Sequence, residues 1–180
     1  STAGTTSFAI YDRIDTPFVE LTGGTDNYWR TVGAGSVDFA DVHLLGAFEV
    51  ARNDGPWQLA ADVKKTNVLA KYTGPLANFD TSLVFSHYDN DWNSTDQVPR
   101  RLVDSGAIDR FGFIDPTLGG RSTRTSLIAS INDERLEAGV WLSQYALNLF
   151  GNFTYFLEDQ ANATSMNRST GAGSVVAMPP

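Results

Sequence analysis

The amino-acid sequence predicts an all-β protein: an antiparallel up-and-down meander that is part of a transmembrane β-barrel with short periplasmic turns and long extracellular loops. Three observations lead to this fold class. Apolar and polar residues alternate with a period of two, as in strands that have one apolar face. Several expected strands exceed the length of about 5–6 residues that is usual in soluble sheets. Short and long connections alternate along the chain, as in outer-membrane barrels.

The alternation is clearest in the third expected strand. Val42, Leu44 and Phe48 fall on one of its faces, and His43 and Glu49 fall on the other. A short strand is expected near 7–12, ahead of seven others. These seven strands are expected at 18–23, 27–38, 42–53, 67–73, 79–90, 123–132 and 135–149.

The connections between these strands sort by length. The second, fourth and sixth are short, whereas the third, the fifth and the tail after residue 150 are long. In a meander, every second connection lies at the same end of the sheet, so the long loops are expected to share one end. Within the longest loop, Pro99 and Gly106 stand where a short helix would begin and end. The connections run over 24–26, 39–41, 54–66, 74–78, 91–122 and 133–134.

Composition excludes several classes of function. The chain has 180 residues, 42% of them hydrophobic, which is too apolar for a disordered protein. Its formal net charge of −8 argues against a nucleic-acid partner, because such binding needs clustered Lys and Arg. The lack of cysteine removes disulfides, thiolate metal sites and cysteine nucleophiles.

No arrangement of residues predicts catalysis, and the chain is not expected to be an enzyme. His43 and His87 have no metal-ligand spacing. Ser86 and His87 are neighbours on one expected strand, so their side chains point to opposite faces and do not make a catalytic pair. We therefore expect no catalytic residue and no cofactor.

An acidic cluster near the end of the fifth expected strand is a candidate cation site. Asp89, Asp91, Asn93 and Asp96 begin like a calcium-binding loop. However, such a loop needs glycine at its sixth position and glutamate at its twelfth, where this chain has Ser94 and Arg100. A solvated loop is the preferred interpretation, and no metal site is expected.

The longest loop and the strands around it resemble the TonB-dependent receptors, a family that imports scarce nutrients across the bacterial outer membrane. The resemblance extends over about residues 3–160. Its most specific part runs from Asp91 to Gly120 and includes Asp91-Trp92-Asn93, Val98-Pro99-Arg100-Arg101, Arg110-Phe111-Gly112 and Ile114-Asp115-Pro116-Thr117. Further similar stretches are Leu21–Asp26, Asn53–Trp57 and Leu147–Leu157.

The resemblance implies a barrel of about 22 strands with an N-terminal plug folded inside it. It divides this chain into the end of a plug-like segment with its linker (1–15), a partial barrel of about seven strands (16–160) and a loop or disordered tail (161–180). It implies residence in the bacterial outer membrane and import of a nutrient such as a ferric siderophore. The implied partners are outer-membrane lipid, a small metal chelate or other nutrient, and the TonB system, whose contact motif is not present in this chain.

Residues expected to contact the ligand lie in the long loops. Arg100 and Arg101 suit an anionic ligand because the planar guanidinium donates paired hydrogen bonds to carboxylates. The alternative for both arginines is local pairing with acidic neighbours on the surface. The six expected ligand-binding residues are Trp57, Asp91, Trp92, Arg100, Arg101 and Asp104.

Two other functions remain open from the sequence. The first is a self-contained outer-membrane barrel of about eight strands, a pore or adhesin, in which the first and last strands would pair. The second is a soluble β-sandwich that binds sugars, in which the apolar strand faces would be turned inward.

Overall fold

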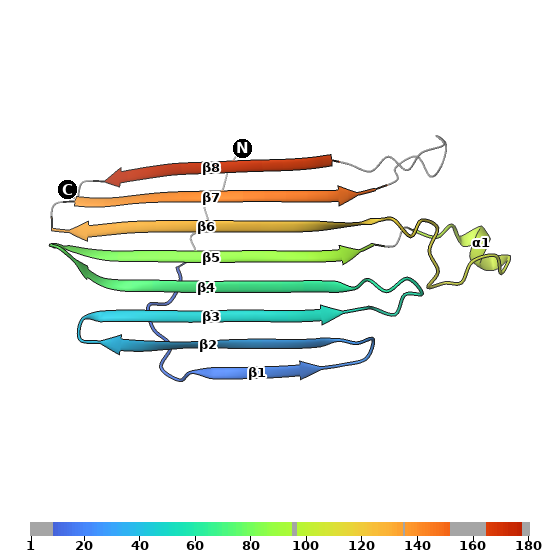
Figure 1. Cartoon of the computed structure of the whole chain (residues 1–180), viewed down its shortest axis with the longest axis horizontal. Helices are drawn as coiled ribbons and strands as arrows, with labels where there is room; N and C mark the ends of the chain where they lie inside the picture. Colours follow the sequence, from blue (N-terminus) through green and yellow to red (C-terminus); the bar gives the residue numbers. More distant parts are fainter. Residues whose placement is uncertain (1–8, 95–96, 135, 152–164, 178–180) are drawn as a thin grey trace, which may run out of the picture.

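A computed structural model describes residues 9–94, 97–134 and 136–151, together with the backbone of 165–177. Eight antiparallel strands form one sheet in which each strand pairs with its neighbour in the chain (Figure 1). The strands are β1 (Phe18–Gly23), β2 (Trp29–Phe39), β3 (Val42–Asn53), β4 (Val63–Leu76), β5 (Phe79–Asn93), β6 (Gly119–Asp133), β7 (Leu136–Phe150) and β8 (Ser165–Ala177).

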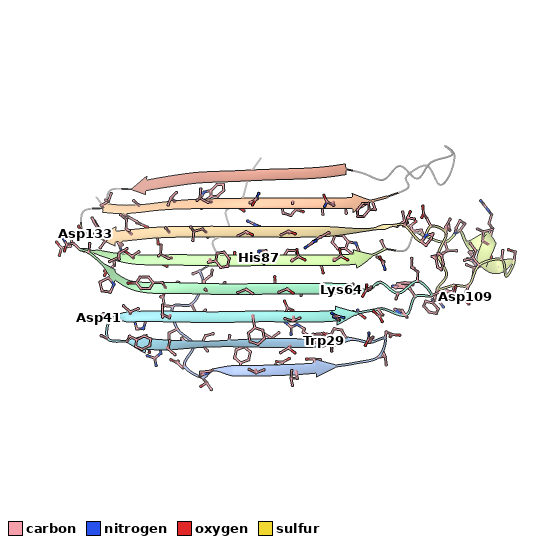
Figure 2. All side chains as sticks on the ribbon, viewed as in Figure 1. Trp29, Asp41, Lys64, His87, Asp109 and Asp133 are labelled. Atoms are coloured by element: carbon pink, nitrogen blue, oxygen red, sulfur yellow. The ribbon has the colours of Figure 1, made fainter. Side chains whose placement is uncertain are left out.

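The expected meander and its sorted connections are confirmed. The turns at 40–41 and 77–78 and the connection from β6 to β7 lie at one end of the sheet, and the long β3–β4 and β5–β6 connections lie at the other. In Figure 2, Asp41 and Asp133 mark the end with the short turns, and Asp109 lies in the long loop at the opposite end. Strands β4 to β6 extend further than the alternation predicted, because cross-strand pairing continues into residues expected to be loop.

Two expectations about secondary structure are wrong. No strand forms over 9–12, the described part of the short strand that was expected near 7–12. Residues 165–177 form β8, although 161–180 was expected to be a loop or disordered tail. This segment is rich in Ser and Gly, which have little strand preference, but it pairs along its length with β7.

One face of the sheet carries an exposed apolar band in the half nearest the short turns. Residues paired across antiparallel strands point to the same face, so the register defines the band. Leu142 is 51% exposed and Leu83 37% exposed, because no second layer covers this face among the described residues. The apolar band comprises Val37, Leu44, Phe48, Leu83, Phe85, Leu127, Val140 and Leu142.

The opposite face is mainly polar. Glu49 lies between three partners there: Arg30 at 2.6 Å, Lys65 at 2.9 Å and Asn67 at 2.6 Å. Ser126 and Ser143 share a hydrogen bond of 3.1 Å further along the sheet. We call this side, with Ser36, Glu49, Lys65, Lys71, Ser82, Ser126 and Ser143, the polar face.

The sheet is open. Strands β1 and β8 are its two edges, and no pairing joins them in the part of the chain that the structure describes. The closed wall expected for a small self-contained barrel is therefore not formed. A sandwich would need a second sheet over the apolar band, and the described strands all belong to one sheet. No described helix has the length and apolar character needed to cross a membrane.

Candidate functional site at the long-loop end

The site is built on two loops that leave the same end of the sheet. The β3–β4 connection contributes Trp57, and the β5–β6 connection contributes the helix α1 (Arg100–Asp104). Pro99 precedes this helix with φ −59°, the value that its ring imposes. Gly106 adopts a φ of +73°, which glycine reaches without strain, and the chain turns away there.

The two loops are joined to each other and to the sheet. The backbone N–H of Gln58 donates to the carbonyl of Phe111 at 3.0 Å, and the rings of Trp57 and Phe111 lie 5.9 Å apart. At the base of the loops, Asn93 N–H donates to the carbonyl of Ala61 at 2.7 Å. These contacts hold the outer parts of both loops in one arrangement.

An open pocket of about 810 Å³ lies between the loops. Two guanidinium groups and an indole share its lining. Arg110 also lies over the Phe111 ring, 5.9 Å from its centre. The pocket therefore combines cationic donors with aromatic surface, a combination that suits a flat anionic ligand. Its lining residues are Trp57, Gln97, Val98, Arg100, Val103, Asp104, Arg110 and Gly112.

The structure brings together three of the six residues expected to bind ligand. Trp57, Arg100 and Asp104 line this pocket, and Arg100 Nε lies 3.4 Å from Asp104 Oδ2. That ion pair is a surface contact, with the Arg100 side chain 92% exposed, so it contributes little to holding the arginine in place. Arg101 lines an adjacent pocket of about 540 Å³, together with Gln97 and other loop residues.

Asp91 and Trp92 line neither of these pockets. Both belong to β5, where successive side chains alternate between faces, so they point in opposite directions. Trp92 pairs in register with Gly120, and a Cβ added to Gly120 would lie 2.7 Å from the indole. Asp91 is exposed opposite Arg121 and Lys64 in the register. Asp91 and Trp92 are consecutive in the sequence, which suggested one site, but their side chains point to opposite faces of β5.

Sequence reasoning missed five residues of the pocket. Arg110 and Gly112 appeared in the stretch that resembles the receptor family, but they were not counted as ligand contacts. The sequence signal for Arg110 was its position beside Phe111 in a loop expected to bind an anion. Gln97, Val98 and Val103 carried no such signal, because their place in the pocket depends on how α1 lies against the β3–β4 loop.

The acidic cluster at the end of β5 is involved in local contacts. Asp89 accepts hydrogen bonds from Arg121 and Thr123, both at 2.9 Å. Asp96 lies outside the described residues. Within the described ranges, no group of three or more His, Cys, Asp or Glu side chains gathers in a way that could hold a metal ion.

Comparison with models of protein families, with curated proteins and with solved structures finds no match to this chain in any of the three.

Proposed function

We propose that this chain is part of the wall of an outer-membrane β-barrel, a receptor of the TonB-dependent kind that imports a scarce nutrient such as a ferric siderophore. The observation that carries the proposal is the apolar band. An open sheet with Leu, Phe and Val side chains between 37% and 55% exposed would be poorly soluble in water. Contact with lipid tails would remove that apolar surface from water, which stabilises the protein by about 25 cal/mol for each Å² removed.

The opposite face supports the same proposal. In a barrel, strands alternate between an apolar outer side and a polar inner side. Charged clusters such as Arg30–Glu49–Lys65 suit a water-filled interior and would be costly against lipid. On the face that carries the apolar band, the strand residues nearer the long loops are polar and include Asp89, Arg121 and Asn148. Polar residues are expected there if these strand ends emerge from the membrane.

The open edges set a condition on this proposal. Unpaired backbone groups cost several kcal/mol each in hydrocarbon, so a sheet edge cannot face lipid. The wall proposed here therefore requires that β1 and β8 pair with further strands in the membrane. This condition distinguishes a larger barrel from the small self-contained one.

The loop pocket is the proposed place of first contact with the nutrient. Its guanidinium groups, Arg100 and Arg110, could bind the carboxylate or phenolate oxygens of an iron chelate, with Trp57 against the flat part of the ligand. The sorting of the long loops to one end supports an outward-facing site.

The membrane part of the proposal can be tested with single cysteines, since the chain has none of its own. Phe85→Cys and Ser86→Cys are adjacent and point to opposite faces. The barrel that contains this wall, reconstituted in vesicles, would carry a polarity-sensitive fluorophore at each site. We expect emission typical of hydrocarbon at position 85 and of water at position 86. Aqueous emission from both positions would overturn the membrane assignment.

The import part has a separate test. Binding of iron-55 as ferric citrate and as an iron–catecholate complex would be measured on the reconstituted protein. The Arg100→Ala/Arg110→Ala variant should bind at least about tenfold more weakly, since two charge-assisted contacts are lost. Arg124→Ala, which removes an arginine of β6 that does not line the pocket, is the control. Equal binding by all three proteins would refute the role of the pocket.

A further inference from the structure

A segment ahead of β1 crosses the polar face of the sheet. Residues 10–15, which we call the strap, pass over β2, β3 and β4 before the chain enters β1 (Figure 1). The strap has no strand or helix structure of its own. Most of its side chains are exposed, so it buries little apolar surface of its own.

Side chains of the sheet hold the strap. Lys71 on β4 donates from Nζ to the carbonyl of Ile10 at 2.7 Å and lies 2.8 Å from the Asp12 carboxylate. Thr73 donates to the same carboxylate at 3.0 Å. On β2, the Ser36 hydroxyl accepts from the N–H of Ile14 at 3.0 Å and donates to its carbonyl at 2.9 Å.

These contacts differ in kind from those between strands. No backbone–backbone hydrogen bond joins the strap to the sheet within the described residues. A segment with few apolar contacts and few backbone hydrogen bonds belongs to the low-stability end of a structure, where local opening costs least. The strap can therefore leave without disturbing the strand pairing beneath it.

One row of residues on the polar face, which includes Lys71, is buried on β3, β4 and β5. Leu45, Lys71 and Val84 are paired in one row of the register, and they are 5%, 9% and 8% exposed. Further along the same row, Ile128 and Trp141 are 45% and 43% exposed. In the register, Leu45 lies between Ser36 and Lys71, the two residues that hold the strap, so the strap passes over Leu45.

Lys71 differs from the other charged groups near the strap. Arg13 lies 3.4 Å from Asp38 and 3.0 Å from Asp15, and His43 lies 2.8 Å from Asp38. All four of these side chains are at least 36% exposed, and such surface pairs contribute little. Lys71 is 9% exposed, and two of its protein contacts come from the strap.

We propose that the strap is a releasable cover over the apolar side chain of Leu45 on the polar face, and that the contact of Lys71 with Asp12 and Ile10 controls its release. When the strap is docked, the Lys71 ammonium group is ion-paired with the Asp12 carboxylate. When the strap leaves, the ammonium group gains water and Leu45 becomes accessible. The proposal does not depend on the import role, because it concerns how two parts of the chain contact each other.

Trypsin cleavage after Arg13 reports directly on release, since a protease needs a locally opened chain. The rate would be followed by mass spectrometry of the N-terminal peptide in the full chain. We expect Lys71→Met to raise this rate about fivefold or more, and added salt to raise it in the wild type but not in the variant. The matched control is Lys64→Met, which removes an exposed lysine from the opposite face of the same strand. It should leave the rate unchanged.

A second measurement separates release from a general loss of folding. Asp12→Asn weakens the same contact from the strap side and leaves the sheet intact. In a Leu45→Cys background, Asp12→Asn should raise the rate of thiol labelling about fivefold, whereas hydrogen exchange in β4 should not change. If neither Lys71→Met nor Asp12→Asn accelerates cleavage or labelling, the strap is a fixed part of the sheet and the proposal fails.

Discussion

Gly33 shows how one residue without a side chain shapes the apolar face. It pairs with Phe48 across β2 and β3, and the Phe48 ring lies over it. A Cβ at position 33 would be 2.5 Å from the ring, which is closer than real contacts allow. The aromatic ring covers the backbone that glycine leaves bare, a recurrent device in sheets.

Gly33→Ala should therefore destabilise the sheet, because it forces the Phe48 ring out of its place. We expect a loss of about 1 kcal/mol in the free energy of unfolding, measured by urea denaturation in micelles. Gly46→Ala is the matched control on the same face of β3, where an added Cβ meets nothing within 4 Å. It should be neutral or slightly stabilising, since alanine loses less backbone entropy than glycine.

Asp12 carries a prediction about pH. The hydrogen bond from the Lys71 ammonium, together with that from Thr73, holds the pKa of this carboxyl below its usual range. A carboxyl whose pKa is lower in the docked strap than in the released strap stabilises docking at pH values above the pKa of the released state. This stabilisation is lost as the pH falls through the pKa of the docked state. The strap should therefore stay docked at neutral pH and loosen below about pH 4.

Hydrogen exchange of the Ile14 amide, corrected for its intrinsic dependence on pH, would measure this loosening. This amide donates to Ser36 in the docked strap. We expect its protection to fall as the solution is acidified below about pH 4 in the wild type. The Asp12→Asn variant should show low protection at every pH. Protection that is independent of pH in both proteins would contradict the prediction.

At the scale of single elements, the short turns impose local strain. The turns at 40–41 and 77–78 are hairpin loops whose first central residue has a positive φ, +52° at Ala40 and +58° at Ala77. This position usually holds glycine in a type II′ turn, because an L side chain is strained there. The strand pairing on both sides keeps alanine in this conformation.

Ala77→Gly should relieve this strain. The gain in the folded state is partly offset by the extra freedom of glycine in the unfolded chain, which leaves a net stabilisation of about 0.5 kcal/mol. Ala70→Gly, in the middle of β4, should have the opposite sign because its backbone is extended. Urea denaturation of both variants checks the prediction, and destabilisation by Ala77→Gly would contradict it.

At the scale of the whole molecule, the two faces of the sheet should differ in their tolerance of charge. If the apolar band meets lipid, Phe85→Arg should cost about 2–4 kcal/mol near the centre of the bilayer. Ser86→Arg, on the neighbouring position and the polar face, should cost well under about 1 kcal/mol. The yield and unfolding midpoint in lipid vesicles would measure both. Similar losses for the two variants would argue against a membrane-facing band.

Much of the architecture could be predicted from local patterns. Alternation with a period of two locates a strand and its faces without knowledge of its neighbours, which is why Val42–Asn53 was predicted with the bounds that the structure has. The helix at Arg100–Asp104 likewise follows from Pro99 and Gly106. In contrast, β8 was missed, because its Ser- and Gly-rich residues form a strand through pairing with β7 and have little strand preference of their own.

The candidate pocket was predicted in part. Trp57, Arg100 and Asp104 carry chemistry that a sequence reveals, and they do line one pocket. Trp92 does not line this pocket, because the alternation of side chains along β5 places its indole against Gly120. Arg110 was overlooked because its place depends on the contact of Phe111 with Trp57, which joins two loops far apart in the chain.

The sequence by itself determined the order of the strands, their two faces and the end at which the long loops gather, since each of these depends on neighbouring residues and on alternation. Only the tertiary structure decided which loop residues meet, that the sheet has two open edges, and that Lys71 is covered by the strap. The physical reason is distance along the chain. A contact such as that of Asp12 with Lys71 arises from how the chain crosses the sheet, and no local pattern of residues encodes that path.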